Sequence, residues 1–112
     1  MTTPAKTPLP FVDRLAEARP DVGAPLQAMF ATLGSETAIP RKYKLLIALA
    51  IDAAGRHPNG CTHIADMARE AGASEEELMD CLCIIGLLCG TGGLATASGV
   101  FPELRGQGFG GA

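Results

Sequence analysis

The chain has 112 residues, of which 47% are hydrophobic and 19% charged, with a net charge of −3 and a pI of about 5.2. This composition excludes a disordered chain, which needs few apolar residues and a high net charge. The acidic balance and the 4% of aromatic residues are not typical of proteins that bind nucleic acids. The length predicts one domain around one hydrophobic core.

The two ends of the chain differ from the middle. Residues 1–10 contain three prolines and no apolar run, so we expect a flexible arm rather than a secretory signal. Residues 106–112 are too rich in glycine to order alone, which leaves residues 11–105 as the single expected domain. Without a signal, the four cysteines (Cys61, Cys81, Cys83 and Cys89) are expected to be free thiols of a cytoplasmic protein.

The first predicted elements are all helices. A short helix over 11–18 ends at Pro20, and an amphipathic helix follows and stops at Gly34. Pro40 opens a third helix, in which the segment 45–54 is almost wholly apolar, as in a helix that is buried on most sides. No strand alternation is visible.

Two further helices follow, separated by Gly72, a residue typical of helix C-caps. Asn59 is a good N-cap for the fourth helix, and Ser74 with Glu77 forms the capping box of the fifth. The fifth helix runs toward Gly90, and the glycines that follow are expected to bend it. The sequence therefore predicts an all-α fold.

A long uncharged segment raises the question of a membrane span. Residues 81–102 carry no charge over 22 positions, which is long enough to cross a bilayer. Glycine, threonine and serine lower the hydropathy of the segment, and aromatic or lysine anchors are missing at its ends. We therefore expect a buried helix and no membrane partner.

The dense cluster of reactive side chains lies around the turn between the third and fourth helices, at Arg56, His57, Asn59, Cys61 and His63. A thiol in the first turn of a helix meets unpaired N–H groups, which stabilise a thiolate. His63 lies two residues from Cys61, on roughly the opposite helix face, so the two meet only through a frayed turn or across a subunit boundary. In the interpretation that the sequence alone favours, Cys61 is a small buried residue.

The other candidates have structural interpretations. Cys81, Cys83 and Cys89 are expected to be packing residues, and the cysteine and histidine spacing is not that of a zinc site. No metal or cofactor is therefore expected. Asp52 interrupts an apolar run and needs a partner, and Arg56, four residues further on, is the expected one.

Several stretches carry a resemblance to a known family. The sequence PRKYKLLIALA at 40–50 is followed by a turn, a histidine, EAGASEEEL at 70–78 and GTGG at 90–93. This pattern resembles the carboxymuconolactone decarboxylase and alkylhydroperoxidase D-like family. The resemblance implies an orthogonal bundle of five to six helices, assembled as a trimeric or hexameric homo-oligomer with pockets near the subunit contacts.

The family's redox motif is only partly present. Redox members carry a glutamate and then Cys-x-x-Cys-x-x-x-His. Counted without gaps, these positions fall on Lys44, Arg56, Asn59 and His63, so only the histidine is retained.

The resemblance implies a small-molecule substrate and leaves three functions open. In a thiol-dependent, peroxiredoxin-like peroxidase, Cys61 would be oxidised and His63 would relay the proton. In a cofactor-free lyase acting on a lactone acid, His63 would move the proton. For either enzyme, the expected substrate-binding residues are Lys44, Arg56 and His57. The third function is a non-catalytic oligomeric binding module.

Overall fold

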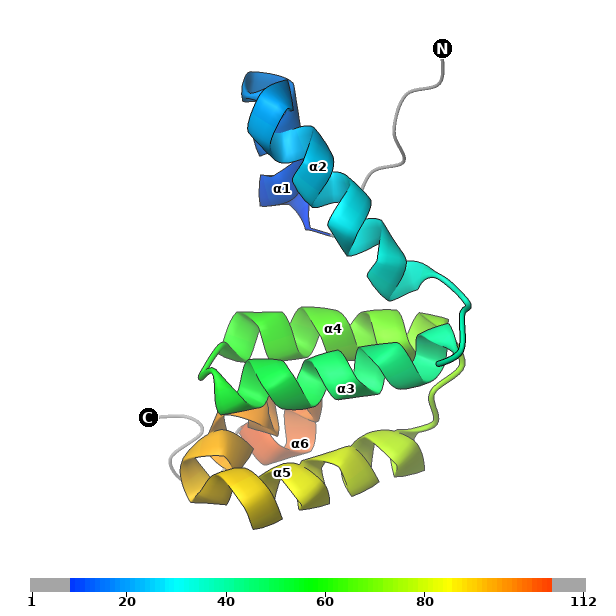
Figure 1. The fold of residues 1–112 in the computed structure, drawn as a ribbon. Helices are drawn as coiled ribbons and strands as arrows, with labels where there is room; N and C mark the ends of the chain where they lie inside the picture. The colour runs from blue at the N-terminus through cyan, green and yellow to red at the C-terminus, as the bar shows by residue number, and fades with distance from the viewer. Residues whose placement is uncertain (1–8, 106–112) are drawn as a thin grey trace. The chain divides into compact units, whose positions relative to one another are not determined.

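The computed structural model describes residues 9–105, and every regular element in that range is helical (Figure 1). The elements are α1 (Pro10–Ala18), α2 (Pro20–Ala31), the 3-10 turn η1 (Thr32–Gly34), α3 (Arg41–Ala54), α4 (Pro58–Glu70), α5 (Glu75–Ala97), the 3-10 turn η2 (Ser98–Val100) and α6 (Pro102–Arg105). The all-α prediction is therefore confirmed for this part of the chain. Most of the expected arm and the whole glycine-rich tail lie outside the described residues.

The chain divides into two compact units, one ending at Arg41 and the other beginning at Lys42. In the first unit, α1 and α2 form a helical hairpin around Val12, which is fully buried. Gly23 allows the close approach, because a Cβ there would collide with the backbone of Ala16. The buried Gln27 donates a hydrogen bond from Nε2 to Asp13 Oδ1, at 3.0 Å.

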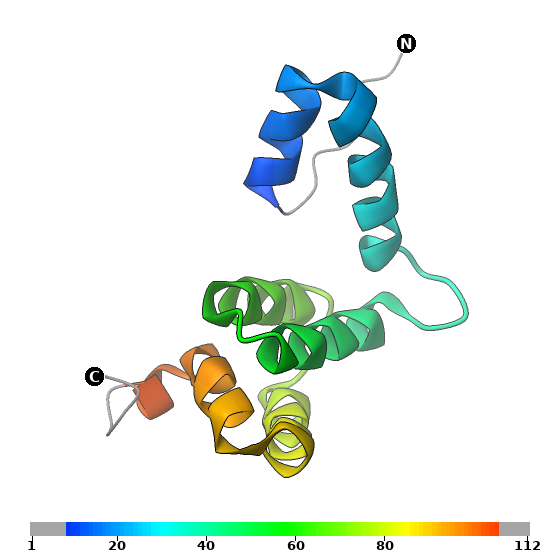
Figure 2. The ribbon, with the colours of Figure 1, turned by 60° about the vertical axis from the view of Figure 1, so that its left-hand side comes forward.

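The second unit is built from α3, α4 and α5. Figures 1 and 2 show α3 and α4 running side by side, with the first half of α5 packed across them. The core between them is aliphatic, because each helix buries one stripe of small and branched residues. Its fully buried members include Leu45, Leu49, Ala65, Leu78 and Leu82.

One arginine joins the end of α4 to the start of α5 and to η2. The Arg69 guanidinium pairs with Glu75 at 2.8 Å and with Asp66 at 3.1 Å, and it donates to the Val100 carbonyl at 2.9 Å. It also lies over the Phe101 ring, 5.8 Å from the centroid. These contacts fix η2 against α4, where the two elements pack.

The α5 helix begins with the predicted capping box. Ser74 Oγ accepts from the Glu77 N–H at 3.0 Å, and Glu77 Oε1 accepts from the Ser74 N–H at 2.8 Å. The bend comes at Gly90, with φ 73° and ψ −174°, earlier than the glycine pair that follows it. Beyond the bend the helix folds back, so that Gly93 lies against Ile85.

Among the described residues, the segment Glu75–Val100 is long and apolar enough to cross a membrane, judged by length and composition alone. Such a helix is weak evidence for a span, because core helices of globular proteins pass the same test.

Candidate functional site

The two predicted catalytic residues face different surroundings on α4. Cys61 is fully buried, and its thiol lies 3.9 Å from the Leu49 carbonyl oxygen of α3, to which it can donate. His63 is exposed on the same helix. The structure therefore keeps Cys61 and His63 apart within the chain. This agrees with the prediction, from their spacing, that they lie on opposite faces of the helix.

The environment of Cys61 keeps its thiol protonated. Its pKa is raised from the ordinary 9.0 to about 11, mainly by burial and further by the nearby Asp52 carboxylate and Cys81 thiol. A nucleophilic cysteine acts as the thiolate, which this environment disfavours. The structure supports the interpretation that the sequence alone favours, in which Cys61 is a packed core residue.

The expected ion pair between Asp52 and Arg56 is wrong. Arg56 lies beyond the end of α3, in the left-handed region with φ 63°. Its guanidinium lies so close to Gly92 that a Cβ there would collide with it. The Asp52 carboxylate instead faces Gly60, in the first turn of α4. Burial raises the pKa of Asp52, and the charge of His57 partly offsets that rise.

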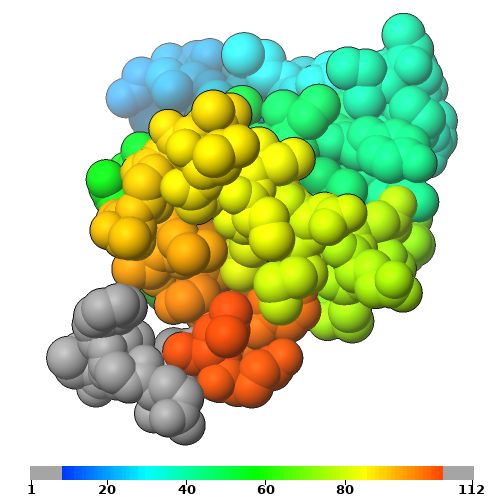
Figure 3. Space-filling view, turned by 90° about the horizontal axis from the view of Figure 1, so that it is seen from below, coloured from blue at the N-terminus to red at the C-terminus, as the bar shows by residue number. Residues whose placement is uncertain are grey.

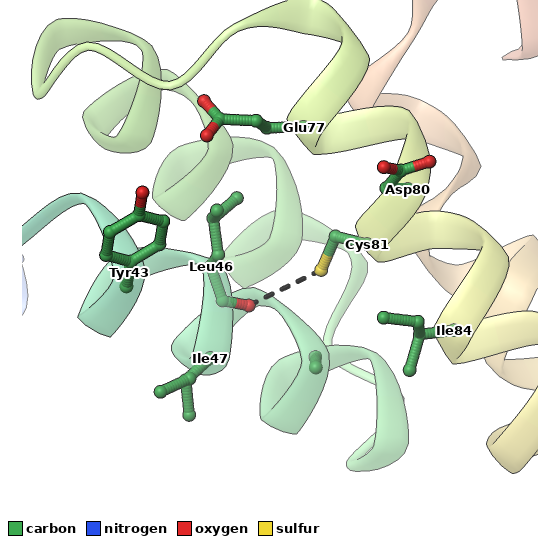
Figure 4. A pocket seen from close by; sticks show the side chains of 8 residues that line it. Tyr43, Leu46, Ile47, Glu77, Asp80, Cys81 and Ile84 are labelled. Atoms are coloured by element: carbon green, nitrogen blue, oxygen red, sulfur yellow. Dashed lines mark hydrogen bonds between the residues drawn. The ribbon is translucent and has the colours of Figure 1, made fainter.

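A groove lies between α3 and α5, away from the predicted cluster (Figure 4). It has a volume of about 380 Å³, which is within the range of small-molecule sites. The lining side chains recur at three- and four-residue intervals along one face of each helix, as helical periodicity requires. They are Tyr43, Leu46, Ile47 and Ala50 of α3 and Glu77, Asp80, Cys81 and Ile84 of α5. His63 and the three predicted substrate-binding residues, Lys44, Arg56 and His57, do not line it.

The thiol of Cys81 forms part of the groove wall. Cys81 is half-buried, and its Sγ donates to the Leu46 carbonyl oxygen across 3.4 Å (Figure 4). Burial raises the pKa of Cys81. The thiol therefore presents a neutral, polarisable surface to the groove.

One end of the groove is polar. The Glu77 carboxylate pairs with Lys42 Nζ at 3.0 Å, and the hydrogen bond from the Ser74 N–H together with Lys42 lowers its pKa. Lys42 Nζ also lies over the Tyr43 ring, 4.9 Å from its centroid. Asp80 is exposed and makes no ion pair or hydrogen bond with any residue from 9 to 104.

The surface beside the groove is strongly apolar. Leu87 and Leu88 of α5 are 81% and 77% exposed, and Ile51 of α3 is 64% exposed. Figure 3 shows the surface of α5 facing outward across the middle of the view. Exposed apolar surface of this kind, when contiguous, marks interaction sites.

Sequence reasoning missed the groove. The signal was present as apolar residues at helical spacing in both 43–50 and 77–84, but such spacing does not say which helices face each other. Among the described residues, no three His, Cys, Asp or Glu side chains come together as a metal site.

Comparison with protein-family models matches residues 20–103, three quarters of the chain, to the model described as "Carboxymuconolactone decarboxylase family". The matched range contains every groove residue as well as Cys61 and His63. Searches of curated proteins and of solved structures gave no significant match.

Proposed function

The chain belongs to the carboxymuconolactone decarboxylase family, and from this membership we propose that it is a homo-oligomeric module that binds a small, largely apolar molecule in the groove between α3 and α5. The observation that carries the proposal is the groove, an open hollow with a volume of about 380 Å³ and a largely apolar surface. Sites of this size and lining are typical of small-molecule binding.

Binding is favoured over thiol-dependent peroxide reduction by the protonation state of two thiols, the buried Cys61 and the half-buried Cys81. Cys61 is inaccessible within the chain and has a pKa of about 11. Cys81 reaches the groove, but its thiol donates to a backbone carbonyl and its pKa is also raised. Neither thiol has the electropositive surroundings that activate a cysteine.

Self-association is supported by the apolar surface around the groove. Leu87, Leu88 and Ile51 are each more than half exposed, and water contact at large aliphatic side chains is unfavourable by roughly 25 cal/mol per Å². Contact with further copies of the chain would cover these residues. A trimer or hexamer, as the family resemblance implies, would place the groove beside a subunit contact.

The test of groove binding uses 1-octanol as a neutral apolar probe, titrated calorimetrically into the full chain. Ala50→Leu fills the groove from the α3 side, and we expect it to weaken octanol binding at least about tenfold through lost volume. Ala54→Leu makes the same change one turn further along α3, at an exposed position outside the groove. It should leave binding unchanged. Equal affinities for the two variants, or no binding to the unaltered chain, would contradict the proposal.

A second candidate is the cofactor-free lyase acting on a lactone acid. It is favoured over the thiol enzyme by one observation, that His63 is solvent-exposed on α4 whereas Cys61 is not. An accessible imidazole can act as a general acid or base, and Arg56 or Lys44 would hold the substrate carboxylate. Carbon dioxide release that persists in Cys61→Ser and is lost in His63→Ala would support this function. Activity that survives His63→Ala would exclude it.

A further inference from the structure

The groove between α3 and α5 has two chemically different ends. Leu46, Ile47, Ala50 and Ile84 provide aliphatic walls, whereas two carboxylates, those of Glu77 and Asp80, come from the first turns of α5. Figure 4 shows both carboxylates on the side of the groove nearer the start of α5, with Ile47 and Ile84 further along. A molecule that fits both ends is itself amphipathic.

The polar end carries an uncompensated negative charge. The Glu77 carboxylate already has two partners, since Lys42 Nζ lies 3.0 Å from it and the Ser74 N–H donates a hydrogen bond to it. Asp80 has no such partner among residues 9–104. The eight lining residues include no lysine, arginine or histidine, so the groove itself supplies no cation to Asp80.

The aromatic residue of the groove already faces one cation, that of Lys42. The Tyr43 ring takes Lys42 Nζ at 4.9 Å from its centroid, which is the distance range of cation–π attraction. An anionic group at this end would meet the Asp80 carboxylate, which has no compensating cation, beside a Glu77 carboxylate that Lys42 compensates, and like charges at short range repel. The charge of the groove therefore selects against fatty or aromatic acids.

Resting on the proposed function, we infer that the ligand of this groove is a small hydrophobic amine, with its apolar body between α3 and α5 and its ammonium group recognised by Asp80. The carboxylate forms a charge-assisted hydrogen bond with the ammonium group. Asp80 is exposed, so the pair is screened by water and its contribution is modest. We expect the amine to bind roughly two- to fivefold more tightly than an uncharged molecule of the same shape.

The test compares octylamine, 1-octanol and octanoate, three probes with the same alkyl chain and different head groups. Each is titrated calorimetrically into the full chain at neutral pH and low salt. We expect octylamine to bind most tightly and octanoate least tightly. The preference for octylamine over octanol should shrink at high salt, because screening weakens the charge pair.

Two variants separate recognition by Asp80 from the general acidity of the protein. Asp80→Asn should reduce octylamine affinity to about that of octanol without changing octanol binding. Glu70→Gln removes the same charge from an exposed position outside the groove, and it should preserve the octylamine preference. The two exposed substitutions leave the core intact, which circular dichroism verifies.

The remaining outcomes each have one meaning. If octanol binds but octylamine binds no better, or if Asp80→Asn and Glu70→Gln behave alike, the inferred amine is wrong and groove binding stands. If none of the three probes binds, groove binding itself fails. If octylamine affinity falls as the protein concentration rises, a second copy of the chain occupies the groove, and the inference of a small amine is overturned.

Discussion

At the scale of single residues, Cys61 sets an alkaline limit to the stability of the fold. Its pKa is raised from 9.0 to about 11 in the folded chain. Below pH 9 both folded and unfolded chains hold the proton, so the full stabilisation is present. Between pH 9 and 11 only the unfolded chain releases it, and the free energy of unfolding falls by about 2 to 3 kcal/mol.

Urea unfolding at a series of pH values from 7.5 to 11 measures this loss. The comparison is with Cys61→Ala, which lacks the titrating group and should lose less stability over the same range. Cys81 also has a raised pKa and contributes in the same direction in both proteins, so the difference between them reports Cys61. Parallel stability curves for the two proteins would contradict the assigned burial.

The four thiols are expected to react in the order of their accessibility. Cys83 is exposed, Cys81 and Cys89 are half-buried, and Cys61 is fully buried. Alkylation by iodoacetamide, followed by peptide mass spectrometry, should modify Cys83 first and Cys61 only on unfolding. Sulfenic acid at Cys61 after treatment with one equivalent of hydroperoxide would contradict this order and restore the thiol-peroxidase function.

Residue-scale prediction from sequence succeeded where helix geometry alone decides. Residues that are two positions apart on a helix lie on roughly opposite faces. In the structure Cys61 is buried and His63 is exposed. The predicted pairing of Asp52 with Arg56 failed because a spacing of four residues brings two side chains together only while the helix continues. α3 ends at Ala54, so Arg56 lies in the turn that the sequence predicts there.

At the scale of elements, the bend in α5 depends on Gly90. Its φ of 73° and ψ of −174° fall in a region that only glycine adopts readily. We expect Gly90→Ala to lower the free energy of unfolding by about 1 to 3 kcal/mol, measured by chemical denaturation. Gly86→Ala is the matched control in the same helix, because a Cβ there meets only Leu94 at an ordinary contact distance of 3.4 Å. It should be neutral or slightly stabilising. Equal destabilisation by both substitutions would contradict the claim that the bend requires glycine at position 90.

The elements that were predicted best have local causes. The capping box of Ser74 and Glu77 requires two residues three apart and nothing else, and the structure contains it. The position of the bend has a tertiary cause. Gly92 leaves room for the Arg56 guanidinium and Gly93 packs against Cys89, so Gly90 is the glycine that turns the chain. Sequence shows a run of glycines but not this division between them.

At the scale of the whole molecule, the exposed leucines of α5 are expected to drive self-association. Leu87→Gln with Leu88→Gln removes apolar surface that is more than three quarters exposed. We expect the double variant to sediment as a smaller species than the unaltered chain in analytical ultracentrifugation. Met29→Gln makes a comparable change at a 69% exposed residue of the first unit and should leave the mass unchanged. An unaltered mass in the double variant would place the subunit contact elsewhere.

The groove could not be predicted from the sequence because it depends on how the helices pack in the whole molecule. The apolar run of α3 predicted burial on most sides, yet Ile47 and Ile51 are 49% and 64% exposed in the chain. Periodicity measures how apolar a face is but not what covers it. The groove walls come from segments more than twenty-five positions apart, and only tertiary packing brings them together.

Glu77 unites three roles in one side chain: it caps α5, pairs with Lys42 and lines the groove. Substitution at this position would therefore disturb folding and ligand choice together. Relatives that diversify their specificity while they keep this architecture would have to vary Asp80 or Tyr43 and hold the glutamate constant. On α5, substitution is therefore tolerated at Asp80 but not at Glu77, one turn earlier.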